Sequence, residues 1–381
     1  MKNKYFFFSL IAYFFFQHFI DTKSISSHLF FIFEDHPVGG KPLSIFLNKL
    51  PKKYNKDVTP SHCVSCDCSF QNQNDLEPLI HCILEKSKFI VQNPSQATFI
   101  FDTYYTNNIR LYNSSSESFS KAASSEIFQK WKGARNLQVD SFDPTESSNI
   151  SSFEFNDQHV LITTNLSLPF IRSNRWLNSR HILIPPLQSL KKYPKLSFSQ
   201  KTSSVTFVAN ISSPNFHAIE NIAKQMKADL ITDIPQAIGT LNKVKISEFV
   251  KHVSQSNFTI FDLSNNSPSL FYEIIRAHSI PVLITESFLP AFANTHIKYG
   301  KMSIKIPPQN ISLIQQRLSK MNVEEAFKEL EKAANWLSWP LDGIATDENA
   351  GGVLLDYLNT RHRVLKPVLR RNFFGSEKVI F

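Results

Sequence analysis

The start of one helix, directly after a buried strand, is the part of this sequence best suited to binding chemistry. Residues 258–261 (FTIF) are mainly apolar and predict the strand. A polar loop then leads to Ser267 as the N-cap and Pro268 as the first helical residue, both favoured at those positions. Unpaired backbone N–H groups and the positive end of the helix dipole make such a start a pocket for a diphosphate. The candidate site comprises Ser267, Ser269, Glu273 and Arg276.

Glu273 lies near the middle of this helix, where its carboxylate can accept two hydrogen bonds from a ribose diol. Arg276 follows one turn later and supplies a positive charge. A strand, a loop and a helix in this order are also common in α/β proteins without such a site. The pattern alone therefore leaves a purely structural role open.

The elements that would position these residues alternate between strands and helices. Short apolar runs predict strands over residues 29–33, 97–101, 160–163, 182–184, 205–209, 230–231, 258–261 and 280–284. Amphipathic patterns predict helices over residues 76–88, 217–226, 247–253 with Ser247 as cap, 268–278, 311–321 and 324–336. This alternation predicts parallel sheets, and the polar, basic stretch 188–203 predicts a linker between two Rossmann-like domains.

The exostosin family of glycosyltransferases resembles this chain most clearly over residues 267–292, SPSLFYEIIRAHSIPVLITESFLPAF. Its other pieces follow in the same order: a first strand similar to LFFIFEDHP, a strand closing the N-terminal half similar to RHILIPP, and one opening the second half similar to VTFVAN. The resemblance extends over about residues 29–337. It depends on the shared order and spacing of these pieces rather than on any one of them.

The resemblance implies a GT-B fold, in which two Rossmann-like parallel-sheet domains face each other across a cleft. It also implies an inverting transferase that takes a sugar from a UDP-sugar substrate and transfers it to a glycan acceptor. The chain has no Asp-x-Asp pair of the kind that holds a divalent ion on a diphosphate, so we expect no metal and no cofactor. The expected units are a signal anchor (1–20), a stem (21–28), an acceptor domain (29–195), a nucleotide-sugar domain (196–335) and a tail that packs back on the first domain (336–381).

Inversion needs a base that takes the proton from the acceptor hydroxyl. Asp35 and His36 follow the first predicted strand and are the leading candidates, and Asp102 after the second is the next. Each of these residues can equally be a loop cap or a turn residue.

Two residues depart from the family pattern in the most similar segment. Leu270 stands where family members carry an arginine that contacts the diphosphate, and His278 stands where a glycine is usual. The alternative prediction is therefore a catalytically inactive member that binds glycans or acts as a scaffold.

The N-terminus reads as a targeting segment, because Lys2 and Lys4 precede an apolar run over residues 5–20. An uncleaved signal anchor and a cleaved signal peptide both fit its length. We favour the anchor, whose positive end would stay in the cytoplasm and leave the folded part in the lumen. The family resemblance implies that such a chain is a single-pass type II protein of the Golgi membrane. The sequence is compatible with a monomer, a homodimer or a heterodimer.

The cysteines test that compartment, because an oxidising lumen pairs thiols. Two disulfides among Cys63, Cys66, Cys68 and Cys82 are the leading prediction, and a zinc site that uses the adjoining histidines is the alternative. Weaker support for a lumenal glycoprotein comes from seven Asn-x-Ser/Thr sequons, at Asn113, Asn149, Asn165, Asn210, Asn257, Asn265 and Asn310.

The net charge of +9 suits anionic partners such as diphosphate donors, acidic glycans or a membrane surface. No nucleic-acid-binding signature accompanies the charge, so we expect no nucleic acid partner. A basic, membrane-anchored module that binds polyanions is the third function considered.

Overall fold

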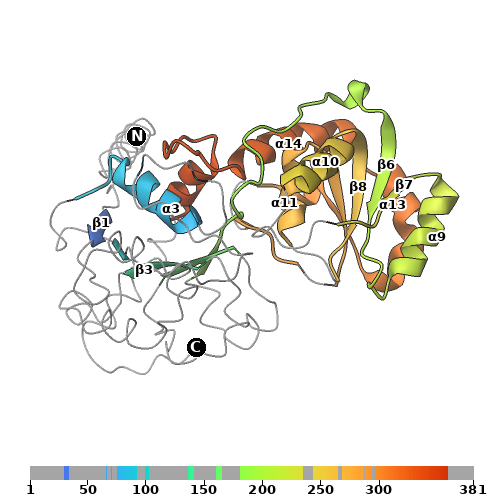
Figure 1. Ribbon diagram of the computed structural model, residues 1–381, viewed down its shortest axis with the longest axis horizontal. Helices are drawn as coiled ribbons and strands as arrows, with labels where there is room; N and C mark the ends of the chain where they lie inside the picture. The colour runs from blue at the N-terminus through green and yellow to red at the C-terminus, as the bar shows by residue number, and fades with distance from the viewer. Residues whose placement is uncertain are drawn as a thin grey trace, which may run out of the picture.

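Two parallel β-sheets form the scaffold of this chain (Figure 1). The computed structural model describes residues 30–33, 66, 70, 75–91, 99–102, 136–140, 160–164, 181–234, 243–264, 268–286, 288–293 and 297–358. The predicted α/β class with parallel sheets is confirmed.

The part of the first sheet that the structure describes has five strands in the order of the chain, β1-β2-β3-β4-β5. These strands are β1 (Phe30–Phe33), β2 (Phe99–Asp102), β3 (Asn136–Asp140), β4 (Val160–Thr163) and β5 (His181–Leu183). Helix α3 (Leu76–Glu85) precedes β2 and contacts β1. Its buried residues include Leu76, Leu79, Ile80 and Ile83, which recur at helical spacing and so form one apolar stripe.

The second sheet has the order β10-β9-β8-β6-β7, also all parallel. Its strands are β6 (Ser203–Val208), β7 (Asp229–Ile231), β8 (Ser256–Asp262), β9 (Ile280–Ile284) and β10 (Ile304–Ile306). All five residues of β9 are buried, as expected for a strand covered on both faces. The strand order reverses between β6 and β8, which creates a topological switch point at that edge.

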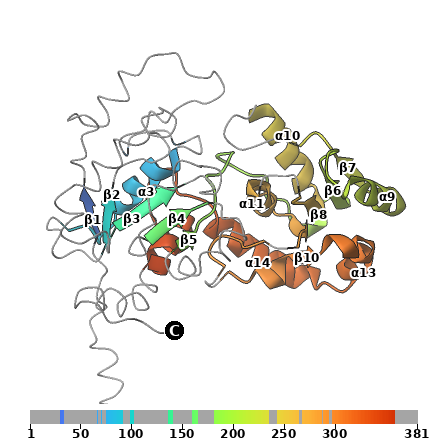
Figure 2. The ribbon, with the colours of Figure 1, turned by 90° about the horizontal axis from the view of Figure 1, so that it is seen from below.

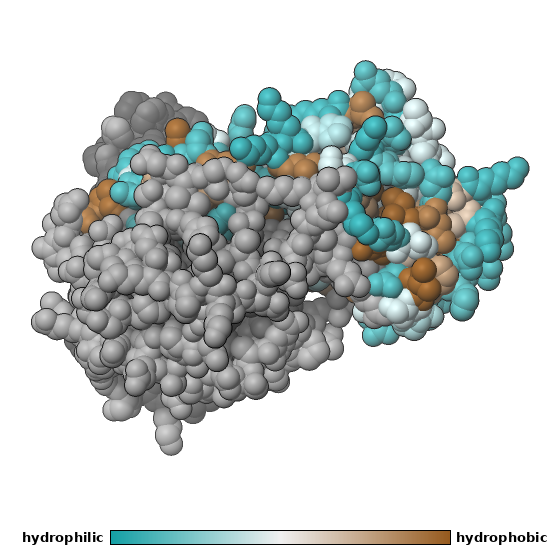
Figure 3. Space-filling view, viewed as in Figure 1, coloured by the Kyte–Doolittle hydropathy of each residue, from teal (hydrophilic) through white to brown (hydrophobic). Residues whose placement is uncertain are grey.

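Helices lie on both faces of the second sheet, with α10 and α11 on one side and α9 on the other (Figure 2). They are α9 (Phe216–Met226), α10 (Lys243–Ser254), α11 (Ser269–Arg276), α12 (Tyr299–Met302), α13 (Ile314–Ser319) and α14 (Val323–Trp336). Short 3₁₀ helices η4 (Phe198–Gln200) and η5 (Pro308–Leu313) and a last helix over residues 350–358 complete the described elements. On the face of Figure 3, the described surface is mainly hydrophilic, with hydrophobic residues in separate patches.

Three expectations about elements need correction. Ser247 is not a cap but an exposed residue inside α10, because the buried face of that helix already begins at Ile246 and continues at Phe249, Val250 and Val253. The predicted helix over residues 311–321 is instead two shorter elements, because residues 311–313 belong to the 3₁₀ helix η5 and only Ile314–Ser319 form an α-helix, α13. Strands β3 and β10 were not predicted, since each is short and interrupts its apolar residues with polar ones.

Two segments connect the halves, one on the way from β5 to β6 and one on the way from α14 to the last helix (Figure 1). Lys201 anchors the first segment, because its ammonium donates hydrogen bonds to the carbonyl oxygens of Ser254, Ser256 and His278 at 2.8–2.9 Å. The second segment reaches α3, where Lys86 donates a hydrogen bond of 2.7 Å to the carbonyl oxygen of Asp342.

Among the described residues, no helix combines the length and the apolar character needed to cross a bilayer. The predicted anchor (1–20) and stem (21–28) lie outside the described residues.

Candidate functional site

Helix α11 begins at the carboxyl end of β8, as the sequence predicted. Its first residue is Ser269, and Pro268 is the N-cap rather than the first helical residue. Pro268 makes no side-chain capping hydrogen bond, and the first turn holds no acidic residue. Ser267, the predicted cap, lies outside the described residues. The positive end of the dipole of α11 is thus neither capped by the N-cap side chain nor neutralised by a carboxylate of its first turn.

Asp262, the last residue of β8, organises the sheet edge in front of this helix. The side chain is fully buried and accepts hydrogen bonds from the hydroxyl of Ser213, from Asn215 Nδ2 at 3.4 Å, and from both the backbone N–H and the hydroxyl of Ser264 at 3.0 and 2.8 Å. These partners come from the loop after β6 and the loop after β8, so Asp262 joins the two loops at the switch point. Asp262 was not among the predicted site residues, although an acidic residue at the end of a buried strand is a signal that the sequence carries.

Glu273 lies on α11 but is turned into the interior rather than towards the start of the helix. Its side chain is fully buried, and Arg276 Nη1 donates to Oε1 at 2.9 Å. The backbone N–H of Ser189 also donates to Oε1, at 3.3 Å, and the hydroxyl of Tyr193 donates to Oε2. Burial, followed by the nearby Glu273 carboxylate, raises the pKa of Tyr193 well above its usual value, so this hydroxyl stays a donor. Both carboxylate oxygens that could accept a ribose diol are therefore engaged by the linker and by Arg276.

Arg276 is 1% exposed and connects three parts of the chain. Besides Glu273, its guanidinium donates to the carbonyl oxygen of Pro186 at 2.8 Å and, through Nε at 3.2 Å, to that of Leu337. Leu270, where the family carries an arginine, is also fully buried. The structure thus brings Arg276 together with Glu273 at the junction between the halves and does not place its charge at the start of α11.

The candidate bases are placed only in part. Asp35 and His36 lie outside the described residues. Asp102 is the last residue of β2 and is paired in register with Phe33, the last residue of β1. Asp140 ends β3 opposite Thr163 of β4. It is a further acidic residue at the same edge of the sheet, and neither it nor its strand was predicted.

Cys66 and Cys82 form a disulfide that joins a residue before α3 to the middle of that helix. The bridge removes these two cysteines from the zinc alternative, and Cys63 and Cys68 lie outside the described residues. Within the described ranges, no group of three His, Cys, Asp or Glu side chains is arranged to hold a metal ion.

Solved structures with a distant likeness to this chain include a protein complexed with UDP and an enzyme named for a UDP-sugar. The glycotransferase of kitacinnamycin matches with 10% identity over 76% of this chain and 80% of its own, at a TM-score of 0.31. Arabidopsis thaliana UGT89C1 complexed with UDP matches with 12% identity over 76% of each chain, at a TM-score of 0.33. A putative UDP-N-acetylglucosamine 2-epimerase from Listeria monocytogenes matches with 10% identity over 93% of this chain and 100% of its own, at 0.34.

Comparison with curated protein sequences finds no match. The model of the exostosin GT47 domain, in contrast, matches residues 39–321, which is most of the chain and includes the whole of α11. This match agrees with the resemblance over residues 267–292. The chain therefore belongs to the exostosin GT47 family, and it is a glycosyltransferase.

Proposed function

We propose that this enzyme is an inverting, metal-independent transferase that moves a sugar from a UDP-sugar to a glycan or glycoprotein acceptor in the secretory pathway. The observation that carries the proposal is the start of α11, which follows the carboxyl end of β8 and, among the described residues, has an N-cap, Pro268, without a side-chain capping hydrogen bond and a first turn without an acidic residue. The backbone N–H groups there can stabilise the charge that develops on the departing diphosphate. The two parallel sheets are consistent with a GT-B arrangement.

In this reaction the acceptor oxygen attacks the anomeric carbon from the face opposite the diphosphate. The new carbon–oxygen bond forms as the bond to the diphosphate breaks, and UDP leaves with the electron pair. The proton of the acceptor hydroxyl passes to a base from the first half, for which Asp35 and His36 are the leading candidates and Asp102 is the next. The disulfide between Cys66 and Cys82 supports an oxidising, lumenal location, to which a type II signal anchor in the Golgi would hold the chain.

We further propose that Glu273 binds the ribose of the donor, whose hydroxyl groups replace the hydrogen bonds that Tyr193 and Ser189 of the linker now donate to its carboxylate. Tyr193 and Ser189 hold the carboxylate from outside the helix, whereas Arg276 holds it from one turn away on α11 itself. Only the linker contacts must open for Glu273 to accept a diol, because the ion pair with Arg276 can persist.

Titration of the purified full chain with UDP tests this role. Replacing Glu273→Gln keeps the size of the side chain and removes its charge, and it should weaken UDP binding by about tenfold or more. Replacing Tyr193→Phe removes a competing donor, so the same titration should show UDP binding as tight as in the wild type or tighter. Equal UDP affinity in Glu273→Gln and the wild type would exclude Glu273 from the donor site.

Release of UDP from a panel of UDP-sugars in the presence of an oligosaccharide acceptor tests the transfer itself. Activity should persist in EDTA, and the product should have the anomeric configuration opposite to that of the donor, as read by NMR. Loss of all activity in EDTA, or a product that retains the donor configuration, would contradict the proposed mechanism.

A second candidate function is glycan binding without transfer. The buried Leu270 and the engaged carboxylate of Glu273 favour it, since both reduce the groups available to a donor. A chain of this kind would bind oligosaccharides but neither bind UDP nor release it from any UDP-sugar.

A further inference from the structure

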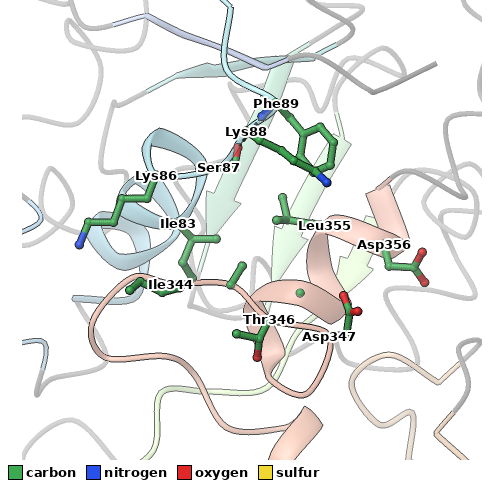
Figure 4. Close-up of a pocket in the computed structure, with 12 residues that line it drawn as sticks. Ile83, Lys86, Ser87, Lys88, Phe89, Ile344, Thr346, Asp347, Leu355 and Asp356 are labelled. Atoms are coloured by element: carbon green, nitrogen blue, oxygen red, sulfur yellow. Dashed lines mark hydrogen bonds between the residues drawn. The ribbon is translucent and has the colours of Figure 1, made fainter. Parts of the chain in front are cut away.

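A pocket of about 700 Å³ opens where α3 ends and the last helix, residues 350–358, begins (Figure 4). One wall comes from the end of α3 and the residues that follow it, and the other from residues 344–356. A volume of this size lies within the range of about 300–1,000 Å³ that is typical of small-molecule sites. Because a crossover helix runs antiparallel to the strands it joins, the end of α3 lies at the amino edge of the first sheet, away from the carboxyl edge where we place the transfer.

The pocket has an apolar floor and a polar rim. Ile83 from the α3 wall and Leu355 from the opposite wall form the apolar part of the lining, together with the ring of Phe89 (Figure 4). Asp347 and Asp356 lie on the side of the last helix, whereas the amine of Lys86 points away from the centre towards its partner Asp342. This combination of an aromatic ring, aliphatic groups and carboxylates suits a ligand that has both apolar and hydroxylated faces.

Several polar groups of the pocket retain hydrogen-bonding capacity. The carboxylate of the exposed Asp347 has no hydrogen bond to another described residue, while its backbone carbonyl is fixed by Trp336 Nε1 at 3.1 Å. Thr346 Oγ1 accepts from Asn349 Nδ2 at 2.9 Å and Ser87 Oγ accepts from the N–H of Phe89 at 3.3 Å, so each hydroxyl keeps its proton to donate.

The same surroundings disfavour a phosphate or another anion. The end of α3 presents the negative end of the helix dipole to the pocket, and Asp347 and Asp356 offset the charge of the two lysines in the lining. Both lysines already have partners, since Lys86 donates to the carbonyl oxygen of Asp342 and Lys88 lies over the ring of Phe89. The start of the last helix does not offset the negative end of the α3 dipole, because the N–H of Gly352 is capped by Asn349 Oδ1 at 3.0 Å. The lining therefore favours a neutral, polyhydroxylated ligand over a nucleotide.

We propose that this pocket binds a sugar unit of a glycan, at a site separate from the site of transfer. The ring of Phe89 packs against the C–H face of the sugar, Asp347 accepts hydrogen bonds from its hydroxyl groups, and Thr346 and Ser87 donate to its oxygens. Glycan binding here needs no donor and no transfer, so the site can serve either an active enzyme or an inactive member.

The test uses the purified full chain on an array of immobilised oligosaccharides built from hexose, hexosamine and hexuronate units, with inorganic phosphate as the competing anion. Asp347→Asn should lower the affinity for the bound oligosaccharides by about tenfold or more, because the amide replaces a charged acceptor. Glu348→Gln is the matched control, since this neighbouring exposed carboxylate does not line the pocket, and it should bind as the wild type does.

UDP titration and melting temperatures are measured on the same proteins. Both variants should melt near the wild type and bind UDP equally, so failure of glycan binding is distinguishable from failure of the donor site. The proposal is overturned if no oligosaccharide binds, if Asp347→Asn and Glu348→Gln bind alike, or if phosphate displaces the glycan from the wild type.

Discussion

At the scale of single residues, two helices end in a backbone conformation that favours glycine without having one. His278 after α11 has a φ of 59° and Lys227 after α9 has a φ of 50°. At the first of these ends, the N–H groups of His278 and Ser279 donate to the carbonyl oxygens of Ile275 and Ile274, which is a Schellman motif. The family's glycine at the position of His278 therefore has a physical reason: a side chain in this conformation costs about 1–2 kcal/mol.

His278 also makes stability depend on pH. Burial, followed by the positive charges of Lys195 and Lys201, lowers the pKa of its imidazole to about 4 from 6.5. The unfolded chain then binds a proton between these pH values while the folded chain does not, so the free energy of unfolding should fall as the pH drops from 6.5 to 4. In His278→Gly this loss should be absent, as urea unfolding at a series of pH values would show.

Lys227→Gly is the control for His278→Gly, because it relieves the same backbone conformation at an exposed side chain. It should raise the free energy of unfolding by about 1 kcal/mol and leave the slope against pH as in the wild type. In His278→Gly the gain in stability from relieving the backbone conformation is offset at neutral pH by the loss of the packing contacts of the imidazole. A wild-type slope that persists in His278→Gly would show that other groups cause the acid sensitivity.

At the scale of elements, the segment after α14 passes very close to the disulfide on α3. Gly343 has a φ of 75°, and a Cβ atom at this position would lie 2.4 Å from the sulfur of Cys82. Gly343→Ala should therefore lower the free energy of unfolding by about 2–4 kcal/mol, from backbone strain and the forced shift of the bridge. Thermal melting of the oxidised protein measures this.

Gly300→Ala serves as the matched substitution, since a Cβ there meets nothing within 4 Å and Gly300 lies in helix α12. Alanine favours helix over glycine by about 1 kcal/mol, so this variant should melt at or above the wild-type temperature. Equal melting temperatures of Gly343→Ala and Gly300→Ala would contradict the prediction, because the chain would then tolerate a Cβ atom beside Cys82 without loss of stability.

Local sequence patterns were enough to locate most of the helices and strands that the structure describes. Residues 160–163 and 280–284 were predicted with the exact bounds of β4 and β9, because each is a continuous apolar run. Strand β3 was missed because Asn136 and Gln138 alternate with its apolar residues, a pattern that a five-residue strand shares with many loops.

The candidate site shows the same limit. The start of α11 could be predicted from Pro268 and the run that follows, since capping is a local property. The partners of Glu273 could not, because Tyr193 and Ser189 are 80 and 84 residues away in the chain. Which side of a helix is buried against a linker depends on how the halves pack, and short-range spacing carries no information about that.

At the scale of the whole molecule, the two halves meet through hydrogen bonds to backbone groups of the crossing segments. Trp339 Nε1 donates to the carbonyl oxygen of Pro185 at 2.9 Å, and the side chain of Gln188 pairs with the backbone of Trp339 at 2.7 and 2.9 Å. The N–H of Phe292 donates to the carbonyl oxygen of Leu183 at 2.9 Å. Both crossings are thereby bound to each other and to the second half, so we expect the halves to unfold together.

Arg276 is the group on which we expect this junction to depend most, because it contacts the segment between β5 and β6, α11 and the residue after α14. Arg276→Met keeps the length of the side chain but leaves the buried carboxylate of Glu273 without its ion pair and two carbonyl oxygens without a donor. It should lower the free energy of unfolding by about 3–5 kcal/mol, and it should separate the single calorimetric transition that we expect for the wild type into two. Arg317→Met, at an exposed position of α13, should change stability by no more than about 0.5 kcal/mol. If the two variants melt alike, apolar contacts rather than Arg276 hold the halves together. The linker could then open for donor binding, as we propose, whether or not Arg276 stays in place.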